Sequence, residues 1–474
     1  MPPFLANWQA PKKLIAFIGC CLALAAVLGY LAAYVAWPIL LGGVVSCLLI
    51  GVIMRNPVVG AYLLIFFLPF ERIGSIDIAN VTIRISQVIA IATVTSWIIR
   101  GFALNKFKLR SNPIIWPLFI FAIINILGII NSPNLQRSLV VLTFTLFTIA
   151  IAIMLPNVLR HPHQIQIAII VLCASMALVT LFGLYQFFGD VLGLPTSVTG
   201  LRPQYSKDIL GFPRVQATAL EPLYFANYLL IPLSILLALL LNRQRVIKPL
   251  VMIGLIALGG LNVILTVSRG GYIALAVAGL VLGCIYYKEV LRPRNVLALT
   301  ITAVVVLALA FKFFNVAEQL EVFTKHVTNI FGGASYVERV ETWSLAYDIW
   351  LEHPWVGVGP GGFGPIASFH PLITPGTGYK IVNNEYFELL AETGLLGLLT
   401  FSVMVSQLLI RSYKAIQRGR DQFLKTCLVG LTVALVAILV QYNTFSILYI
   451  MHIWATIGLM IATQNLLLHE KTAS

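Results

Sequence analysis

Residues 249–287 read PLVMIGLIALGGLNVILTVSRGGYIALAVAGLVLGCIYY, and this stretch decides the class of fold. It contains two apolar runs, 249–267 and 271–287. Each run is close to the roughly 20 residues that an α-helix needs to cross a bilayer. Arg269 stands between the runs with no acidic residue beside it. The stretch therefore predicts two transmembrane helices joined by a turn that carries a lone arginine.

The composition of the whole 474-residue chain extends this pattern. Hydrophobic residue types make up 59% of the chain and charged types only 10%, and the mean hydropathy is +0.94. A soluble domain carries about 25% charged residues, so this composition excludes a water-soluble enzyme. The candidate spans are 14–35, 38–54, 57–70, 83–99, 113–131, 138–155, 164–188, 218–241, 249–267, 271–287, 295–314, 386–410, 425–443 and 445–467. We predict an all-α, polytopic transmembrane helix bundle of about 12–14 spans.

The distribution of charge predicts the orientation of the bundle. With all candidate spans counted and a cytoplasmic N-terminus, most of the 31 lysines and arginines lie on the cytoplasmic side, and most of the 17 acidic residues lie on the other side. This asymmetry is the positive-inside pattern, and it predicts cytoplasmic N- and C-termini. The net charge of +14 comes from lysines and arginines that lie between apolar runs and not on one face of a folded domain. This distribution argues against nucleic acid as a partner.

Two long segments on the extracytoplasmic side interrupt the series of spans. One covers 189–217, and the other covers about 315–385, where we expect short helices. The predicted organisation is therefore eleven transmembrane helices in 1–314, a large extracytoplasmic loop in 315–385, and three transmembrane helices with a short cytoplasmic tail in 386–474. Long structured loops on one face are where function usually concentrates.

Three arginines on the predicted outer side are candidate functional residues: Arg214 in GFPRVQA, Arg269 in LTVSRGGY and Arg339 in ERVETW. A charge near the hydrocarbon costs about 2.5–3.5 kcal/mol on insertion scales, so it tends to mark function. A guanidinium can bind two oxygens of an anion through its planar fork. In the alternative interpretation, Arg269 reaches lipid headgroups, Arg214 is solvated, and Arg339 forms a local ion pair.

Two further motifs lie ahead of the last three spans and at the start of the first of them. The run EHPWVGVGPGGFG at 352–364 includes Gly359 and Gly361, which allow the backbone to approach a ligand closely or to form a compact turn. It has no Walker lysine, so we exclude nucleotide binding. In the run NNEYFELLAETGLLG, Glu385, Glu388 and Glu392 fall near one helical face. The first two also suit the positive end of a helix dipole.

Histidines and cysteines give no sign of a bound metal. The histidines are dispersed without metal-ligand spacing, and the six cysteines lie inside or at the edges of apolar runs. We therefore expect no metal, cofactor or disulfide framework. His370 lies ahead of the acidic run and is a candidate general base, with an ordinary loop histidine as the alternative.

The order of these motifs resembles the O-antigen ligase and O-antigen polymerase superfamily of bacterial envelope glycan assembly. The resemblance covers about residues 205–400. It includes the loop of Arg214, the Ser268-Arg269-Gly270 turn, RVETW from Arg339, HPWVGVGPGGF from His353, and the segment from Asn384 to Gly397. Outside this region the resemblance rests on hydropathy alone.

The resemblance implies a metal-independent glycosyltransferase in the bacterial inner membrane. Its donor would be a glycan on undecaprenyl diphosphate, its acceptor a hydroxyl of another glycan or of a lipid core, and its surroundings membrane lipid. Arg214 and Arg269 would stabilise the leaving diphosphate, and both are therefore candidate catalytic residues. The candidate substrate-binding residues are Arg339, Asn383, Asn384, Gly359 and Gly361.

One position departs from the family pattern. Ligases of this family usually show His-Asn where this chain has Asn383-Asn384, and that histidine is thought to activate the acceptor. An asparagine side chain cannot accept a proton at neutral pH. The base is then Glu385 or His370, or the chemistry needs no strong base, or the chain is of the polymerase type.

Two other classes of function compete with the glycosyltransferase. A transporter of an anion or of a lipid-linked glycan would also need many spans, but a carrier places ionisable residues near the bilayer midplane, often in paired repeats. Here these residues concentrate on one face, and the sequence shows no convincing internal repeat. A structural membrane scaffold is the third interpretation.

Overall fold

The computed structural model describes residues 37–78, 81–103, 109–292, 334–369, 379–446 and 448–469. The α-helices are α2 (Trp37–Arg55), α3 (Pro57–Phe67), α4 (Ile85–Ala103), α5 (Ile115–Gly128), α6 (Leu135–Val158), α7 (Pro162–Val191), α8 (Thr196–Thr199), α9 (Lys207–Leu210), α10 (Pro222–Leu241), α11 (Pro249–Leu265), α12 (Arg269–Ile285), α13 (Tyr287–Val290), α16 (Ala334–Glu352), α17 (Phe363–Phe369), α18 (Glu385–Arg418), α19 (Gln422–Gln441) and α20 (Met451–His469). The 3-10 helices are η2 (Leu68–Phe70), η3 (Ile129–Asn131), η4 (Pro203–Tyr205) and η5 (Ala217–Ala219).

The helices confirm the predicted class of fold. Within the described residues, 7 helices are long and apolar enough to cross a membrane, namely α4, α6, α7, α10, α18, α19 and α20. The shorter apolar helices are α2, α3, α5, α11 and α12. Every predicted span that falls in the described residues coincides with one of these helices. The spans predicted at 14–35 and 295–314 lie outside those residues, so the total number of spans stays a prediction.

Local sequence signals set where many of these helices begin. Proline occupies the first turn of α3, α7, α10 and α11. It fits there because the first helical N–H groups have no partner within the helix. In five helices, α3 among them, an N-cap side chain accepts a hydrogen bond from the first turn, as an N-cap should. These side chains belong to Asn56, Asn134, Ser268, Asn384 and Asp421.

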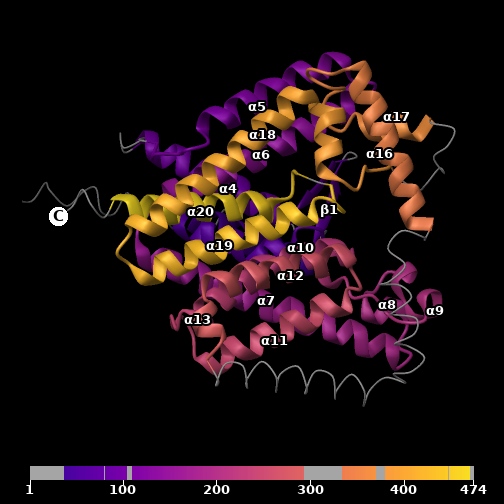
Figure 1. Ribbon diagram of the computed structural model, residues 1–474. Helices are drawn as coiled ribbons and strands as arrows, with labels where there is room; N and C mark the ends of the chain where they lie inside the picture. Colours follow the sequence, from indigo (N-terminus) through magenta and orange to yellow (C-terminus); the bar gives the residue numbers. More distant parts are fainter. Residues whose placement is uncertain are drawn as a thin grey trace, which may run out of the picture.

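The bundle is layered around three central helices, α10, α19 and α20 (Figure 1). Helices α5, α6 and α18 pack on one side of this centre, and α7, α11 and α12 lie on the other. Large side chains of the centre, such as Tyr228 and Trp454, are fully buried. Outer helices instead expose apolar side chains: Trp116 of α5 is 71% exposed and Leu250 of α11 is 81% exposed. Such an apolar outer surface suits contact with lipid chains.

Polar side chains link the central helices to one another. Asn227 of α10 donates to Oε1 of Gln441 on α19 at 2.8 Å, and Nε2 of His452 on α20 lies 2.6 Å from Oδ1 of Asn227. Interhelical hydrogen bonds in membrane proteins contribute roughly 0.6–2 kcal/mol each. The network therefore fixes the register of α10, α19 and α20 against one another.

Most of the short helices between the spans lie at one end of the bundle. Helices α8, α9, α16 and α17 lie at the right of Figure 1, whereas α13 lies at the opposite end. We call the end with α8, α9, α16 and α17 the loop end. The described part of the predicted 315–385 loop contains α16 and α17. A two-stranded antiparallel hairpin, β1 (Ser75–Ile78) with β2 (Val81–Arg84), was not predicted from the sequence.

Helix α18 is broken near its start. Gly394 has φ 65° and ψ −170°, a non-helical conformation inside the element. The segment 354–359 lies against this break and satisfies its backbone groups. The backbone bonds run from Val358 N to Ala391 O (3.0 Å), from Gly359 N to Glu392 O (2.9 Å), from Leu395 N to Pro354 O (2.8 Å) and from Leu396 N to Trp355 O (3.2 Å). Loop and helix start thus form one hydrogen-bonded unit.

Candidate functional site

Arg214 links the loop before α10 to the turn between α11 and α12. Its Nε donates to the carbonyl oxygen of Thr266 and its Nη2 to that of Val267, both at 3.2 Å. The guanidinium carbon also lies 5.6 Å from the ring centre of Tyr205. A guanidinium has five N–H donors, and these two bonds use two of them. Arg214 therefore has a structural role at the turn and keeps donor capacity for a ligand.

Arg269 begins α12 directly after that turn. Ser268 caps the helix by accepting a hydrogen bond from the backbone N–H of Gly271 at 3.3 Å. Gly270 allows close approach, because a Cβ atom there would lie 2.0 Å from Oγ1 of Thr444. The Ser-Arg-Gly-Gly sequence thus combines a cap, a cation and a tight contact at the first turn of α12.

The structure brings the three predicted arginines together at the loop end. Arg339 belongs to α16, far from the other two in sequence. Burial lowers the pKa of Arg339, and the positive charges of Arg269 and Arg214 lower it further. Burial and the charge of Arg269 likewise lower the pKa of Arg214, whereas Tyr205, Tyr272 and Glu221 raise it. The three guanidinium groups therefore lie within electrostatic range of one another.

The glycine-rich run is held by the half-buried carboxylate of Glu392. Glu392 accepts hydrogen bonds from the N–H groups of Gly361 at 2.7 Å and Phe363 at 3.2 Å. Gly359 and Gly361 both have positive φ, and a Cβ on Gly359 would lie 2.8 Å from the carbonyl oxygen of Gly128. These contacts support the compact-turn interpretation, since the run's N–H groups point to Glu392 of the same chain.

The predicted Asn-Asn-Glu segment forms the start of α18. Asn383 has φ 58°, and its N–H donates to Oγ of Ser446 at 3.0 Å. The side chain of Asn384 caps α18 by accepting from the N–H groups of Tyr386 and Phe387. Glu385 is 2% exposed, and it lines a cavity of about 30 Å³ together with Glu388 and Glu392. The predicted acidic face therefore points inward. His370, the other candidate base, lies outside the described residues.

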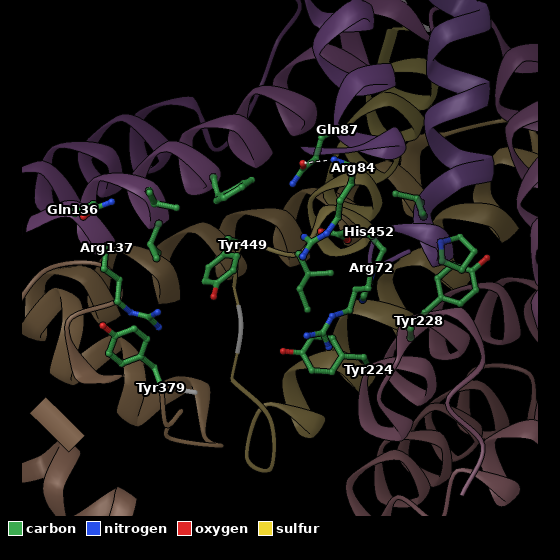
Figure 2. A pocket seen from close by; sticks show the side chains of 18 of the residues that line it. Arg72, Arg84, Gln87, Gln136, Arg137, Tyr224, Tyr228, Tyr379, Tyr449 and His452 are labelled. Atoms are coloured by element: carbon green, nitrogen blue, oxygen red, sulfur yellow. Dashed lines mark hydrogen bonds between the residues drawn. The ribbon is translucent and has the colours of Figure 1, made fainter. Parts of the chain in front are cut away.

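A second, larger cavity of about 640 Å³ opens beside this segment. Its wall combines residues from 68–72, 84–87, 134–144, 219–228, 379 and 449–452. Figure 2 shows Arg137 and Tyr379 on one side, Arg72 and Arg84 on the other, and Tyr449 between them. The guanidinium carbon of Arg137 lies 4.2 Å from the ring centre of Tyr379, and that of Arg72 lies 4.1 Å from the ring centre of Tyr224.

One loop joins the cavity to Arg214. Glu221 forms an ion pair with Arg72 at 3.5 Å. Burial raises the pKa of Glu221, and the charges of Arg72, Arg202 and Arg214 oppose this shift. Thr218 donates to the carbonyl oxygen of Pro69 at 2.6 Å. The segment 214–221 therefore has Arg214 at one end and a cavity wall at the other.

The cavity and its charged residues were not predicted from the sequence. Glu71 and Arg72 directly follow the apolar run 57–70, Arg84 falls at the start of the run 83–99, and Arg137 precedes the run 138–155. Each is an ionisable residue at the outer end of a predicted span. This is the signal that singled out Arg269, and it could have been applied to these positions as well.

The fold and the site together define a multi-pass helical membrane protein with a cluster of arginines at its loop end. Residues 253–402 match a protein-family model described as O-antigen ligase. Over residues 253–402 this match confirms the resemblance to the O-antigen ligase and polymerase superfamily, and it supports an O-antigen ligase/polymerase-type membrane enzyme. Arg214 precedes the matched region. The matched region includes Arg269, Arg339 and the whole segment from Gly359 to Glu392. No curated protein sequence matches the chain.

Proposed function

We propose that this protein is a glycosyltransferase that moves a glycan from undecaprenyl diphosphate to a hydroxyl of an acceptor glycan or of a lipid core. The observation that carries the proposal is the meeting of Arg214, Arg269 and Arg339 at the loop end of an O-antigen ligase-type bundle. The loop end would face the extracytoplasmic side of the bacterial inner membrane, with both termini in the cytoplasm, as the charge asymmetry predicts.

Electrostatics favours a diphosphate at this cluster. Like charges brought together by a fold repel one another, and a ligand with two or more negative charges relieves that repulsion. An arginine about 4 Å from a phosphate gains about 4 kcal/mol at an effective dielectric constant of roughly 20. Guanidinium groups also match phosphate oxygens through paired hydrogen bonds. Arg214, Arg269 and Arg339 are therefore proposed to bind the donor's diphosphate.

The same arginines would assist departure of the diphosphate. The acceptor hydroxyl oxygen attacks the anomeric carbon, the bond from that carbon to the phosphate oxygen breaks, and its electron pair stays on the diphosphate. Donors fixed where negative charge develops lower the barrier without the need to reorganise solvent. Arg214 and Arg269 are the proposed catalytic residues, with Arg339, Asn383, Asn384, Gly359 and Gly361 proposed around the substrates. Glu385 and His370 stay predicted candidates for the base.

Reconstitution with a defined donor tests the proposal. The purified protein in liposomes is given an undecaprenyl-diphosphate glycan together with either a glycan acceptor or a lipid core, and both chain lengthening and transfer to the core are measured. Either product supports glycosyl transfer and tells polymerase from ligase. Donor that is moved across the bilayer but never consumed would identify a transporter and would contradict the proposal.

A further inference from the structure

The cavity of about 640 Å³ has the composition of a saccharide site. Tyr224, Tyr379 and Tyr449 line it with aromatic rings, and Gln87 and Gln136 supply side-chain amides whose NH2 groups can donate hydrogen bonds (Figure 2). Sugars combine apolar C–H faces with hydroxyl groups, so a wall of aromatic rings and amides complements both parts. A purely apolar lipid chain would offer these amide groups no hydrogen-bond partner.

The charges of the cavity favour a saccharide that is negatively charged. Arg84 and Arg137 line it from opposite sides (Figure 2). Within the described part of the chain, Nε of Arg84 is buried and makes no hydrogen bond. Its guanidinium nevertheless lines the cavity, where a ligand oxygen would accept hydrogen bonds from it. A carboxylate or phosphate group on the saccharide would provide such an oxygen and offset the positive charge.

Glu71 places a carboxylate in the same wall. One of its oxygens, Oε2, accepts a hydrogen bond from the backbone N–H of Met451 at 3.1 Å. That bond fixes the side chain at the end of η2, and the residue lines the cavity together with Arg72 and Arg84. A carboxylate held in this way can accept a proton from a hydroxyl group that enters the cavity.

We propose that this cavity is the acceptor subsite: it binds a negatively charged saccharide, and Glu71 takes the proton of the attacking hydroxyl. The proposal rests on the proposed function. The acceptor oxygen forms the new bond to the anomeric carbon, the bond to the diphosphate breaks with its electron pair on the diphosphate, and the hydroxyl proton moves to Glu71. The loop 214–221, which joins the cavity wall to Arg214, connects this subsite to the diphosphate site.

The surroundings of Glu71 suit a base that works near neutral pH. Burial raises its pKa to about 7, while the hydrogen bond from Met451 and the charges of Arg84 and Arg72 oppose the shift. The other titratable groups of the cavity wall are Arg137, Tyr224, Tyr228, Tyr379, Tyr449 and His452, and Glu221 lies behind Arg72. Because a base must be ionised, activity should rise with pH through about 7 and level off above it.

Binding to the whole protein in lipid nanodiscs tests the subsite. The probes are a tetrasaccharide of hexuronic acid, the same tetrasaccharide with its carboxyl groups reduced, and undecaprenyl diphosphate. We expect wild type to bind the acidic probe more tightly than the reduced one. Arg84→Gln should weaken acidic-probe binding at least tenfold and leave undecaprenyl diphosphate binding within twofold. Arg243→Gln, at the opposite end of α10 with a side chain that is 67% exposed, serves as the control and should change neither.

The outcomes separate the two proposals. If Arg84→Gln weakens undecaprenyl diphosphate binding and spares the acidic probe, the cavity belongs to the donor and the inference is wrong. If wild type does not prefer the acidic probe, or if Arg84→Gln leaves its binding unchanged, the inference also fails. If undecaprenyl diphosphate does not bind at all while acidic-probe binding depends on Arg84, the subsite stands and the proposed donor is wrong.

The role of Glu71 has its own readout in the reconstituted transfer assay. Glu71→Gln should lower kcat by about 100-fold or more with little change in the KM of the acceptor, and the rise of activity through pH 7 should disappear. Glu71→Asp should keep that rise with a smaller loss. Unchanged kcat for Glu71→Gln, or a retained rise in a variant that still binds undecaprenyl diphosphate, would exclude Glu71 as the base.

Discussion

Among single residues, Arg214 and Arg269 both contribute to the turn between α11 and α12. Arg214 donates to the carbonyl oxygens of Thr266 and Val267, and Arg269 begins the helix that follows. Removing Arg214 would therefore release the turn as well as one cation, whereas removing Arg269 leaves the turn's bonds to Arg214 in place. Substitution of Arg269 therefore tests its charge while these two hydrogen bonds of the turn stay in place.

Substitution of Arg269 tests the diphosphate site. Arg269→Ala should lower transfer about 100- to 1000-fold, as expected when one strong contact to a developing charge is lost. Arg269→Lys should recover only part of this loss, because lysine keeps the charge but lacks the planar fork. Transfer kinetics in liposomes measure both. Arg243→Gln is the control, and near-wild-type transfer by Arg269→Ala would exclude the diphosphate role.

Substitutions of Asn383 test whether the backbone conformation at this position restricts which side chain it can carry. Asn383 has φ 58°, a left-handed conformation that asparagine and histidine tolerate better than other side chains do. Asn383→His should therefore fold normally and keep or raise ligase activity. Asn383→Val should lower the free energy of unfolding by about 1–2 kcal/mol, since a β-branched side chain is strained in this region. Thermal unfolding compares the two, and equal stability would contradict the expectation.

At the scale of elements, the break in α18 depends on Gly394. A Cβ atom there would lie 2.3 Å from the backbone carbon of Trp355, and φ is 65°. We expect Gly394→Ala to destabilise the protein by at least 2 kcal/mol, because it adds both strain and a clash. Gly279→Ala in α12 is the matched control, since nothing lies within 4 Å of its Cβ position.

The comparison needs one stability measurement and one local measurement. Gly279→Ala should be neutral or slightly stabilising, as Gly-to-Ala changes inside helices usually are. In Gly394→Ala, the N–H groups of Val358 and Gly359 should exchange faster with solvent, because they donate to the start of α18. Similar melting temperatures for the two variants would show that the break tolerates a side chain.

Elements were predictable where local sequence decides them. Apolar runs of span length, proline in first turns and N-cap asparagines depend on neighbours in the chain, and the predicted spans in the described residues all became helices. The break at Gly394 was not predicted, since the partner 354–359 that stabilises it lies outside α18. The hairpin at 75–84 was missed because its few residues lie between two dominant apolar signals.

The site was predictable only in part, because some of its contacts join segments that are distant in the sequence. Arg214, Arg269 and Arg339 were each predicted as functional residues on the outer side, and the structure places their guanidinium groups within electrostatic range of one another. The cavity is built from several distant segments, among them 68–72, 134–144 and 449–452. Their meeting depends on how α3, α6 and α20 pack, and no local pattern encodes that packing.

At the scale of the whole molecule, the orientation in the membrane is testable. Asp208 is exposed in α9 at the loop end, and Arg418 is exposed at the end of α18. In a background without the native cysteines, Asp208→Cys should react with an impermeant maleimide added outside spheroplasts, and Arg418→Cys should react only after permeabilisation. This labelling pattern is expected because the predicted cytoplasmic segments carry the excess of lysine and arginine. The reverse labelling pattern would overturn the predicted topology.

The hydrogen-bonded union of segment 354–359 with the start of α18 has a consequence for biogenesis. A helix break inside a bilayer leaves backbone groups that lipid cannot satisfy. Here the segment that satisfies them precedes α18 in the chain, so the ribosome makes it first. On the predicted topology, segment 354–359 is also exported before α18, so it is already outside the membrane when α18 enters the translocon. Because of this order in the chain, segment 354–359 is available to bond the helix break at Gly394 as soon as α18 is inserted.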